Sequence, residues 1–360
     1  MTRWLARLAF VIAALAMLGG AGLVWLRMQL EQPGPALAQQ TLLVPRGNGL
    51  TEIAEQMQEA GLIRSPWLLI AEAWLTGKTR LQAGEYAFPP KISMAAALEM
   101  MAQGHVVIRR VTVPEGLSTA EILELLRDTD GLQGKIPARP DEGSLLPETY
   151  HYNFGDSRDA LLNRMHKGMV QLLDEQWSKR DPDSPLTNKI EALILASIVE
   201  KETARSTERP HIAAVFLNRL RRHMKLQSDP TVIYGLTLGE EPLGRSLTRD
   251  DLLSPSPYNT YYVEGLPIGP ICNPGKASLN AVLHPDESDD LYFVADGSGG
   301  HAFAATLSEH NRNVSRWRAL QAGGRDAAPA GTPEESSPDA PPPLKPATRK
   351  PHPTGKAKHR

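Results

Sequence analysis

Asn-Lys-Ile-Glu-Ala-Leu-Ile-Leu-Ala-Ser-Ile-Val-Glu-Lys-Glu-Thr-Ala, residues 188–204, is the stretch that decides the fold of this chain. Asn188 can cap a helix, and Glu191 stands at the offset of a capping box. No Gly or Pro interrupts the stretch. Helical residues lie about 100° apart around the axis, so the apolar side chains here point in every direction. A helix that is apolar all round is normally buried, and we therefore predict a central core helix.

Two carboxylates, Glu200 and Glu202, stand near the end of this helix and point to nearly opposite sides. Glu202 lies near Glu191, whereas Glu200 shares its face with apolar and small residues. These residues are Leu193, Ala196, Ser197 and Ala204. A carboxyl group in such surroundings loses solvation, which raises its pKa and lets it serve as a general acid near neutral pH. We predict Glu200 as that acid, with room for a ligand beside it, and Glu202 as a surface or ion-pair residue.

A second interpretation of the same helix stays open. Both glutamates could mark the exposed end of a core helix, with Glu200 paired with an Arg, because ion-pair networks also place carboxylates in this way. The two interpretations differ in what surrounds the carboxyl group of Glu200.

The composition bounds the class of protein. The chain has 360 residues, a net charge of −2 and 41% hydrophobic residues, which suffices for two or three domains and gives no support for nucleic-acid binding. Cys272 is the only cysteine, so no disulfide within the chain is possible and the fold depends on its core. Nothing near Cys272 indicates an activated thiol.

An uncharged apolar run, residues 8–26, follows a short N-terminus with two arginines. At about 1.5 Å per residue, the run nearly spans the hydrocarbon core of a membrane, which is about 30 Å thick. Trp4 and Trp25 stand at its ends, where aromatic residues favour the membrane interface. We predict that residues 1–27 form a cytoplasmic N-terminus and a transmembrane helix, with residues 28 onward outside the cytoplasm.

A cleaved signal peptide is the alternative to this anchor. The one small-x-small candidate for cleavage, residues 36–38, lies well past the apolar run, beyond Arg27 and two prolines. An uncleaved anchor is therefore favoured. Residues 28–40 are largely polar and contain prolines, so we interpret them as a linker from the membrane to the first domain.

The rest of the chain divides into a small α+β subdomain, a larger mixed α+β domain and a tail. Residues 41–105 form the subdomain, and a second related unit begins at Val106. The two share an internal echo, because the Val-Pro-x-Gly turns at 44–47 and 113–116 each precede a capped amphipathic helix pattern. No metal or nucleophile constellation lies in the subdomain, which favours a structural or glycan-contacting role. The larger domain is 106–325. In 326–360 large apolar side chains are rare, so we predict a disordered Pro-rich tail.

The segment 258–275 is dense in Pro and Gly and carries aromatic and amide groups. A rigid loop of this kind suits a carbohydrate site, because sugars offer hydroxyl groups to amides and C–H faces to Tyr. An ordinary structured loop is the alternative, and the sequence leaves both open.

Several motifs, in order over more than a hundred residues, resemble one known family. They are Ala196-Ser197-Ile198-Val199-Glu200-Lys201-Glu202-Thr203, Val215-Phe216-Leu217-Asn218-Arg219-Leu220, Leu226-Gln227-Ser228-Asp229-Pro230-Thr231-Val232-Ile233-Tyr234-Gly235, Tyr258-Asn259-Thr260-Tyr261, Gly265-Leu266-Pro267 and Gly300-His301-x-Phe303. With these motifs the chain resembles the endolytic murein transglycosylases, the YceG-like family of bacterial cell-wall enzymes. The resemblance covers the membrane segment and residues 41–105, where the family carries a LysM-like subdomain. The Pro-rich tail lies outside it.

The resemblance implies one catalytic glutamate, and the matching position is Glu200. It implies cleavage inside glycan strands between N-acetylmuramic acid and N-acetylglucosamine, which leaves 1,6-anhydro-muramic ends and terminates new strands. The proposed glycan contacts are Gln227, Asp229, Asn259 and Tyr261, and no metal or cofactor is required. The resemblance also implies an inner-membrane protein with a periplasmic catalytic domain, with peptidoglycan synthases (penicillin-binding proteins) as partners.

One carboxylate is chemically sufficient for this reaction. Most glycoside hydrolases need two carboxylates, because the second one activates a water molecule or acts as the nucleophile on the far side of the sugar. A lytic transglycosylase uses the substrate's own C6 hydroxyl group, whose high effective concentration replaces the second carboxylate. Glu200 would therefore act first as acid and then as base.

Two other functions remain as alternatives. A membrane-anchored scaffold that only binds peptidoglycan would keep the LysM-like region and an inert second domain. A metal hydrolase would use histidines, of which the chain offers His211, His223, His284, His301 and His310. None of these stands at a spacing that puts two ligands and a Glu on one helix face, so this function is disfavoured.

Overall fold

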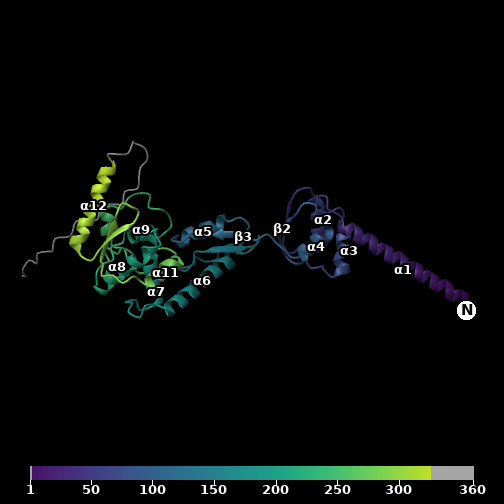
Figure 1. Ribbon diagram of the computed structural model, residues 1–360, viewed down its shortest axis with the longest axis horizontal. Helices are drawn as coiled ribbons and strands as arrows, with labels where there is room; N and C mark the ends of the chain where they lie inside the picture. Colours follow the sequence, from purple (N-terminus) through teal and green to yellow (C-terminus); the bar gives the residue numbers. More distant parts are fainter. Residues whose placement is uncertain (1, 326–360) are drawn as a thin grey trace, which may run out of the picture. The chain divides into compact units, whose positions relative to one another are not determined.

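The computed structural model describes residues 2–325, and the predicted disordered tail, 326–360, lies outside the described residues (Figure 1). The chain divides into two compact units, Met1–Leu172 and Leu173–Arg360. Helices predominate in the described part, together with three antiparallel two-stranded sheets. The mixed α+β class is therefore confirmed. The division at residue 172 falls inside the segment 106–325, whose status as one domain stays a prediction.

The first helix of unit 1, α1 (Thr2–Glu31), carries the apolar run. Its portion Phe10–Glu31 is long and apolar enough to cross a membrane by length and composition. The predicted N-terminal apolar helix is thus confirmed as a helix, and a membrane-spanning role is consistent with it.

Residues 28–40 do not form a free linker, and this interpretation is corrected. The helix continues to Glu31, and the side chain of Leu30 is only 1% exposed within the adjacent hydrophobic core. The backbone of Gly34 then donates to Lys91 O and Ile92 O at 3.2 and 3.1 Å. A Cβ at Gly34 would lie against backbone oxygens, so this close approach requires glycine. The sequence alone indicated a linker because the residues that bind Gly34 lie more than fifty positions further along the chain.

The subdomain after α1 contains β1 (Gln40–Val44), α2 (Leu50–Glu59), α3 (Pro66–Thr76), β2 (Gly84–Phe88) and α4 (Met94–Ala102). β1 and β2 pair antiparallel, with Gln40 opposite Phe88. Alternate residues of β2 are buried, as expected for a strand with one face on a core. This core includes Met57, Leu69 and Phe88. The LysM-like identity of the subdomain stays a prediction.

The second part of unit 1 contains β3 (Arg109–Thr112), α5 (Thr119–Asp128), β4 (Thr149–Tyr152) and the first part of α6 (Arg158–Ser178). Its hydrophobic core is separate and includes Val111, Ile122 and Met165. The helix α5 begins with a capping box in which Ser118 and Glu121 satisfy each other's backbone groups. Strand, Pro-Gly turn and helix thus occur twice in the same order, β1–α2 and β3–α5, as the internal echo indicated.

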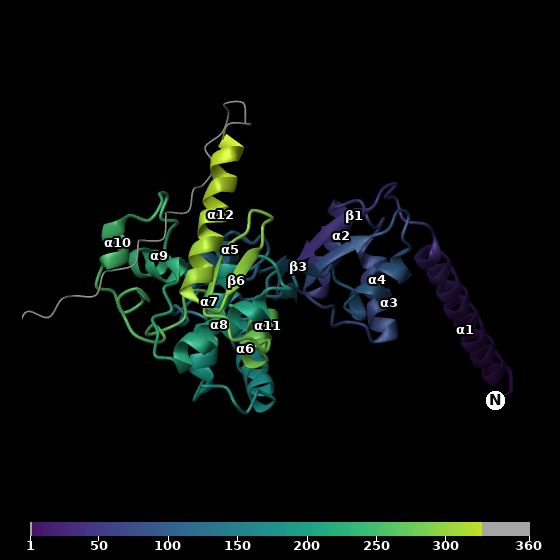
Figure 2. The ribbon, with the colours of Figure 1, turned by 60° about the vertical axis from the view of Figure 1, so that its left-hand side comes forward.

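Unit 2 is organised around α7 (Lys189–Glu202), which packs against α8 (Arg209–Arg221) and α11 (Lys276–Leu283) (Figure 2). Every residue from Ala192 to Val199 is buried, and the side chain of Asn188 accepts a hydrogen bond from Glu191 N at 3.0 Å. The predicted core helix is therefore confirmed. Around it lie α9 (Asp229–Thr237), α10 (Arg249–Leu253), the hairpin of β5 (Tyr292–Ala295) and β6 (His301–Ala304), and α12 (Leu307–Arg325).

Candidate active site

Glu200, in the last turn of α7, is a buried partner of an ion pair. Its side chain is 4% exposed, and Arg209 Nη2 donates to its Oε1 at 2.7 Å. The backbone N of Gly275 donates to its other oxygen, Oε2, at 2.8 Å. Both oxygens of the Glu200 carboxyl group therefore accept a hydrogen bond from the protein. This arrangement corresponds to the second interpretation of the helical wheel, in which Glu200 is paired with an Arg.

The small residues beside Glu200 were predicted to leave room for a ligand, but other residues of the protein fill that space. Ser197 is fully buried, and its Oγ accepts from Ile271 N at 3.0 Å and donates to Ile194 O at 2.7 Å. Residues 271–275, which are all buried, fill this face of α7. Glu200 thus holds together α7, the start of α8 and the N-terminus of α11.

Glu202, the last residue of α7, lies in a different environment. The hydroxyl group of Ser228 donates a hydrogen bond to its Oε1. The pKa of Glu202 is raised from 4.5 to about 7. Burial is the largest cause, the Ser228 hydroxyl opposes it, the neighbouring Asp229 adds to the increase, and the Arg219 guanidinium opposes it. Glu202 is therefore not the surface residue that the helical wheel indicated. It has the desolvated carboxyl group that was expected at Glu200.

A second carboxyl group, Asp229, stands beside this acid at the first position of α9. Tyr261 donates its phenolic hydrogen to Asp229 Oδ1 at 2.6 Å. Burial raises the pKa of Asp229, and the hydrogen bond from Tyr261 works against that rise. Burial also raises the pKa of Tyr261, as does the neighbouring Asp229. Two of the predicted glycan contacts, Asp229 and Tyr261, thus lie together in the surroundings of Glu202. We call Glu202, Ser228, Asp229 and Tyr261 the acid cluster.

The acid cluster rests on two loops that buried threonines hold together. Ser228 N donates to Thr260 Oγ1 at 2.9 Å, and the hydroxyl groups of Thr231 and Thr260 lie 2.9 Å apart. Thr231 Oγ1 also donates to Ser228 O at 2.6 Å. All three of these side chains are buried. The motifs around residues 228 and 260, which are separate in the sequence, therefore form one rigid platform.

Arg219 of α8 is a buried cation near the acid cluster that sequence reasoning did not single out. Its guanidinium donates to Leu226 O and Leu291 O, each at 2.6 Å, and lies 5.4 Å from the centre of the Tyr292 ring. These bonds fix the start of the loop that carries Ser228. Its positive charge also lowers the pKa of Glu202, against the effect of burial.

Gln227 precedes the acid cluster and has an exposed side chain. Its φ angle is +51°, a left-handed conformation that is uncommon for residues other than Gly. The hydrogen bond from Gln227 N to Thr260 O, at 3.2 Å, helps to hold it there. Strained residues gather at functional sites, and the glycan contact predicted for Gln227 stays a prediction.

Asn259 does not have the exposed amide that a glycan contact needs, and its predicted role is corrected. The residue is 0% exposed. Its Nδ2 donates to Leu252 O at 3.0 Å and to Ser254 O at 2.8 Å, and its Oδ1 accepts from Tyr261 N at 2.9 Å. The side chain is fully used in shaping the loop that presents Tyr261.

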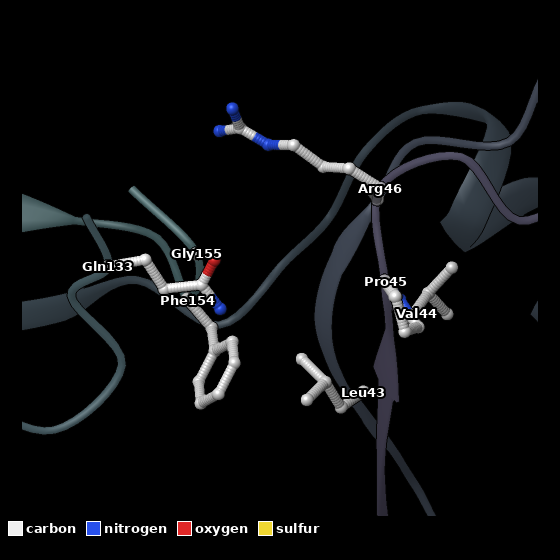
Figure 3. Close-up of a pocket in the computed structure, with 8 residues that line it drawn as sticks. Leu43, Val44, Pro45, Arg46, Gln133, Phe154 and Gly155 are labelled. Atoms are coloured by element: carbon white, nitrogen blue, oxygen red, sulfur yellow. The ribbon is translucent and has the colours of Figure 1, made fainter. Parts of the chain in front are cut away.

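A pocket of about 270 Å³ lies elsewhere, within unit 1 (Figure 3). Leu43 and Phe154 face each other across it, and Arg46, at its rim, forms an ion pair with Asp156 at 3.3 Å. The residues that line it are Leu43, Val44, Pro45, Arg46, Ala83, Gln133, Phe154 and Gly155. None of them is a carboxylic acid, so the pocket lacks the general acid that glycan cleavage requires.

Comparison with known proteins places the chain in one family. A model of the YceG-like family matches residues 42–316. A protein of Bacillus subtilis named endolytic murein transglycosylase is 30% identical over 306 residues, which cover 76% of this chain and 83% of that protein. Proteins of the same name from two Streptococcus pneumoniae strains are 28% identical over 323 residues, and the chain spans 58% of their length. A crystal structure of a putative yceG-like protein from Listeria monocytogenes is 29% identical, with a TM-score of 0.47 over 77% of this chain and 99% of that one.

Proposed function

The chain belongs to the YceG-like family and is a lytic murein transglycosylase, and on that premise we propose that Glu202 is the acid with which it cleaves peptidoglycan glycan strands. The observation that carries this proposal is the desolvated carboxyl group of Glu202, whose pKa of about 7 leaves about half of it protonated at neutral pH. Relatives named endolytic murein transglycosylases support the substrate class.

In the proposed reaction, Glu202 gives its proton to the oxygen between N-acetylmuramic acid and N-acetylglucosamine, and the bond from that oxygen to C1 of the muramic acid breaks. The C6 hydroxyl group of the same sugar then closes on C1, and the Glu202 carboxylate takes the hydroxyl proton. The products are a 1,6-anhydro-muramic end and a free 4-hydroxyl group on N-acetylglucosamine. The intramolecular hydroxyl has a high effective concentration, so no water needs to be activated.

The other members of the acid cluster support this chemistry. A carboxylate at Asp229 would stabilise the positive charge that develops on the sugar ring, and its hydrogen bond from Tyr261 favours the ionised form. The hydroxyl group of Ser228 donates to Oε1 of Glu202, which orients the carboxyl group. Gln227, Asp229 and Tyr261 are the residues that we propose as glycan contacts.

We prefer Glu202 to Glu200, although the family resemblance pointed to Glu200. The side chain of Glu200 is 4% exposed, and its two oxygens accept from a guanidinium and a backbone N–H. These contacts tie Glu200 to α8 and α11 inside the unit, where a substrate oxygen would not reach it. The catalytic role of Glu200 remains a prediction that only an activity measurement can decide.

We further propose that α1 anchors the protein in the inner membrane and that the catalytic unit lies in the periplasm. The length and composition of the segment Phe10–Glu31 support the anchor, and the arginines of the N-terminus support the orientation. From this position the enzyme would cut nascent strands beside the peptidoglycan synthases and so end their elongation.

Digestion of purified sacculi with the full-length protein tests the function. Mass spectrometry should find anhydro-muropeptides with the wild type and with a folded Glu200→Gln variant, and none with Glu202→Gln. If Glu202→Gln is active and a folded Glu200→Gln variant is inactive, Glu200 is the catalytic acid. Reducing ends in place of anhydro ends would indicate a hydrolase, and sacculus binding without any cleavage would favour the scaffold.

A further inference from the structure

The helix α3 of the subdomain has two apolar faces, of which only one is needed for the core. Leu69 and Ala73 are fully buried. The opposite side carries a second apolar stripe at the spacing i, i+4, i+7, i+8, which is one face of a helix. The stripe consists of Trp67, Ala71, Trp74 and Leu75, whereas Ile70 packs against the core. The exposed fractions of its three largest exposed members, Trp67, Trp74 and Leu75, are 74%, 71% and 61%.

This stripe lies next to the end of the proposed membrane anchor. Leu26 and Leu30 of α1 pack against the core of the subdomain, and α1 contacts α3 directly. Arg64, which precedes α3, donates to Gln32, just after α1, at 2.9 Å. Figures 1 and 2 both show α3 on the side of the subdomain from which α1 extends. No flexible tether separates the two helices, so an anchored α1 would hold α3 close to the membrane surface.

The positions of the tryptophans agree with that placement. Trp4 and Trp25 are 21 residues apart, or about 32 Å along a helix, which matches a hydrocarbon core of about 30 Å. Trp25 then falls at the outer interface, and Leu26 on the next position already touches the subdomain. Amphipathic aromatic residues favour this interface, as do helices that lie in its plane with one apolar face.

We propose that α3 is an interfacial helix whose stripe enters the outer surface of the lipid bilayer beside α1. The inference rests on the membrane anchoring proposed above. Arg64 and Arg80, near the two ends of α3, have exposed side chains that would meet anionic lipid headgroups. The one acidic residue of α3, Glu72, lies outside the stripe. The helix would fix the orientation of the subdomain on the membrane.

A fluorescent NBD label at position 75 tests this contact in the full-length protein. The lone cysteine, Cys272, is buried and would be replaced by Ala, and the label attached to Leu75→Cys or to the exposed control site Glu175→Cys. Both proteins would be reconstituted into nanodiscs of phosphatidylcholine and phosphatidylglycerol that contain doxyl-labelled lipid. We expect quenching at position 75 to exceed that at position 175 at least about threefold.

Substitution of the two tryptophans sharpens the test. Trp67→Gln with Trp74→Gln should reduce quenching at position 75 by at least about half, whereas Trp67→Phe with Trp74→Phe should retain it. The thermal unfolding of all variants should match, because both side chains are exposed.

The possible failures are distinguishable. A protein that does not co-elute with nanodiscs overturns both the anchor and the interfacial helix. Co-elution with equal quenching at positions 75 and 175 overturns the interfacial helix alone. Protection of the label by soluble glycan strands, without quenching by lipid, would show that the stripe is a glycan surface.

Discussion

Ser228, at the N-cap of α9, donates its hydroxyl hydrogen to Glu202, at the end of α7. This one bond links the candidate acid to the loop that carries Asp229. It also has a defined electrostatic effect, because a donor to a carboxylate stabilises the charged form and lowers its pKa.

Removal of this donor should therefore shift the pH dependence of the enzyme upward. In Ser228→Ala the pKa of Glu202 should rise above about 7, and the alkaline limb of the kcat/KM profile should move to higher pH. The exposed Ser178→Ala serves as the matched control and should leave the profile unchanged. A shift of the limb to lower pH would contradict the proposed role of the hydroxyl group.

Glu202→Gln should abolish activity and at the same time stabilise the protein at alkaline pH. The folded-state pKa of about 7 exceeds the ordinary value of 4.5, so the contribution of Glu202 to stability is fully present below pH 4.5 and is lost as pH rises through 7. This loss is on the order of 3 kcal/mol. Gln carries no charge, so the variant should have a higher Tm than the wild type at pH 8 and a similar one at pH 4. A lower Tm at pH 8 would contradict the burial of this carboxyl group.

Glu200→Gln should have the opposite effect: it should lower the stability of the protein and leave most of its activity. The substitution leaves the Arg209 guanidinium buried without its carboxylate, and the loss of one partner of a buried ion pair costs about 3–5 kcal/mol. At a temperature where the variant stays folded, kcat should remain within about tenfold of the wild type. Chemical denaturation and kinetics at low temperature measure the two effects separately. The control Glu175→Gln removes an exposed pair with Lys179 and should not change the Tm.

Asn259→Asp should destabilise the loop without a specific effect on substrate binding. The change replaces an amide that donates to two backbone carbonyls by a carboxyl group that cannot donate to both. Unsatisfied buried groups of this kind cost about 1–3 kcal/mol, so denaturant unfolding should shift while KM of the folded enzyme stays the same. The exposed Asn163→Asp should change neither quantity. A large rise in KM with unchanged stability would restore the glycan contact.

The sequence alone was sufficient for the central helix, because the cap at Asn188 and the apolar run depend only on neighbouring residues. It could not distinguish the roles of Glu200 and Glu202. The groups that surround them, Gly275 for one and Ser228 for the other, come from segments 26 to 75 residues downstream. Periodicity shows which side of a helix a residue faces. Tertiary packing decides which groups from other segments surround the side chain on that side.

The loops show the same limit. The dense run of Pro and Gly predicted a rigid loop with a Tyr at the site, and Tyr261 does lie beside Asp229. Asn259, two positions away from Tyr261, faces inward instead and satisfies its own loop. A single sequence does not show that the Asn259 amide faces inward while the nearby Tyr261 faces Asp229. The linker 28–40 was misjudged for a related reason, since Gly34 bonds to residues that lie far along the chain.

The packing of Leu30 into the subdomain core bears on how a water-soluble version of the protein should be truncated. A version that begins at residue 41 would remove this side chain together with the backbone bonds of Gly34, and would leave a cavity that costs several kcal/mol. Trimming just before Met28 keeps both and discards the whole apolar run, residues 8–26. Recombinant preparations of the two lengths should therefore differ in yield and in melting temperature, with the longer one the more robust.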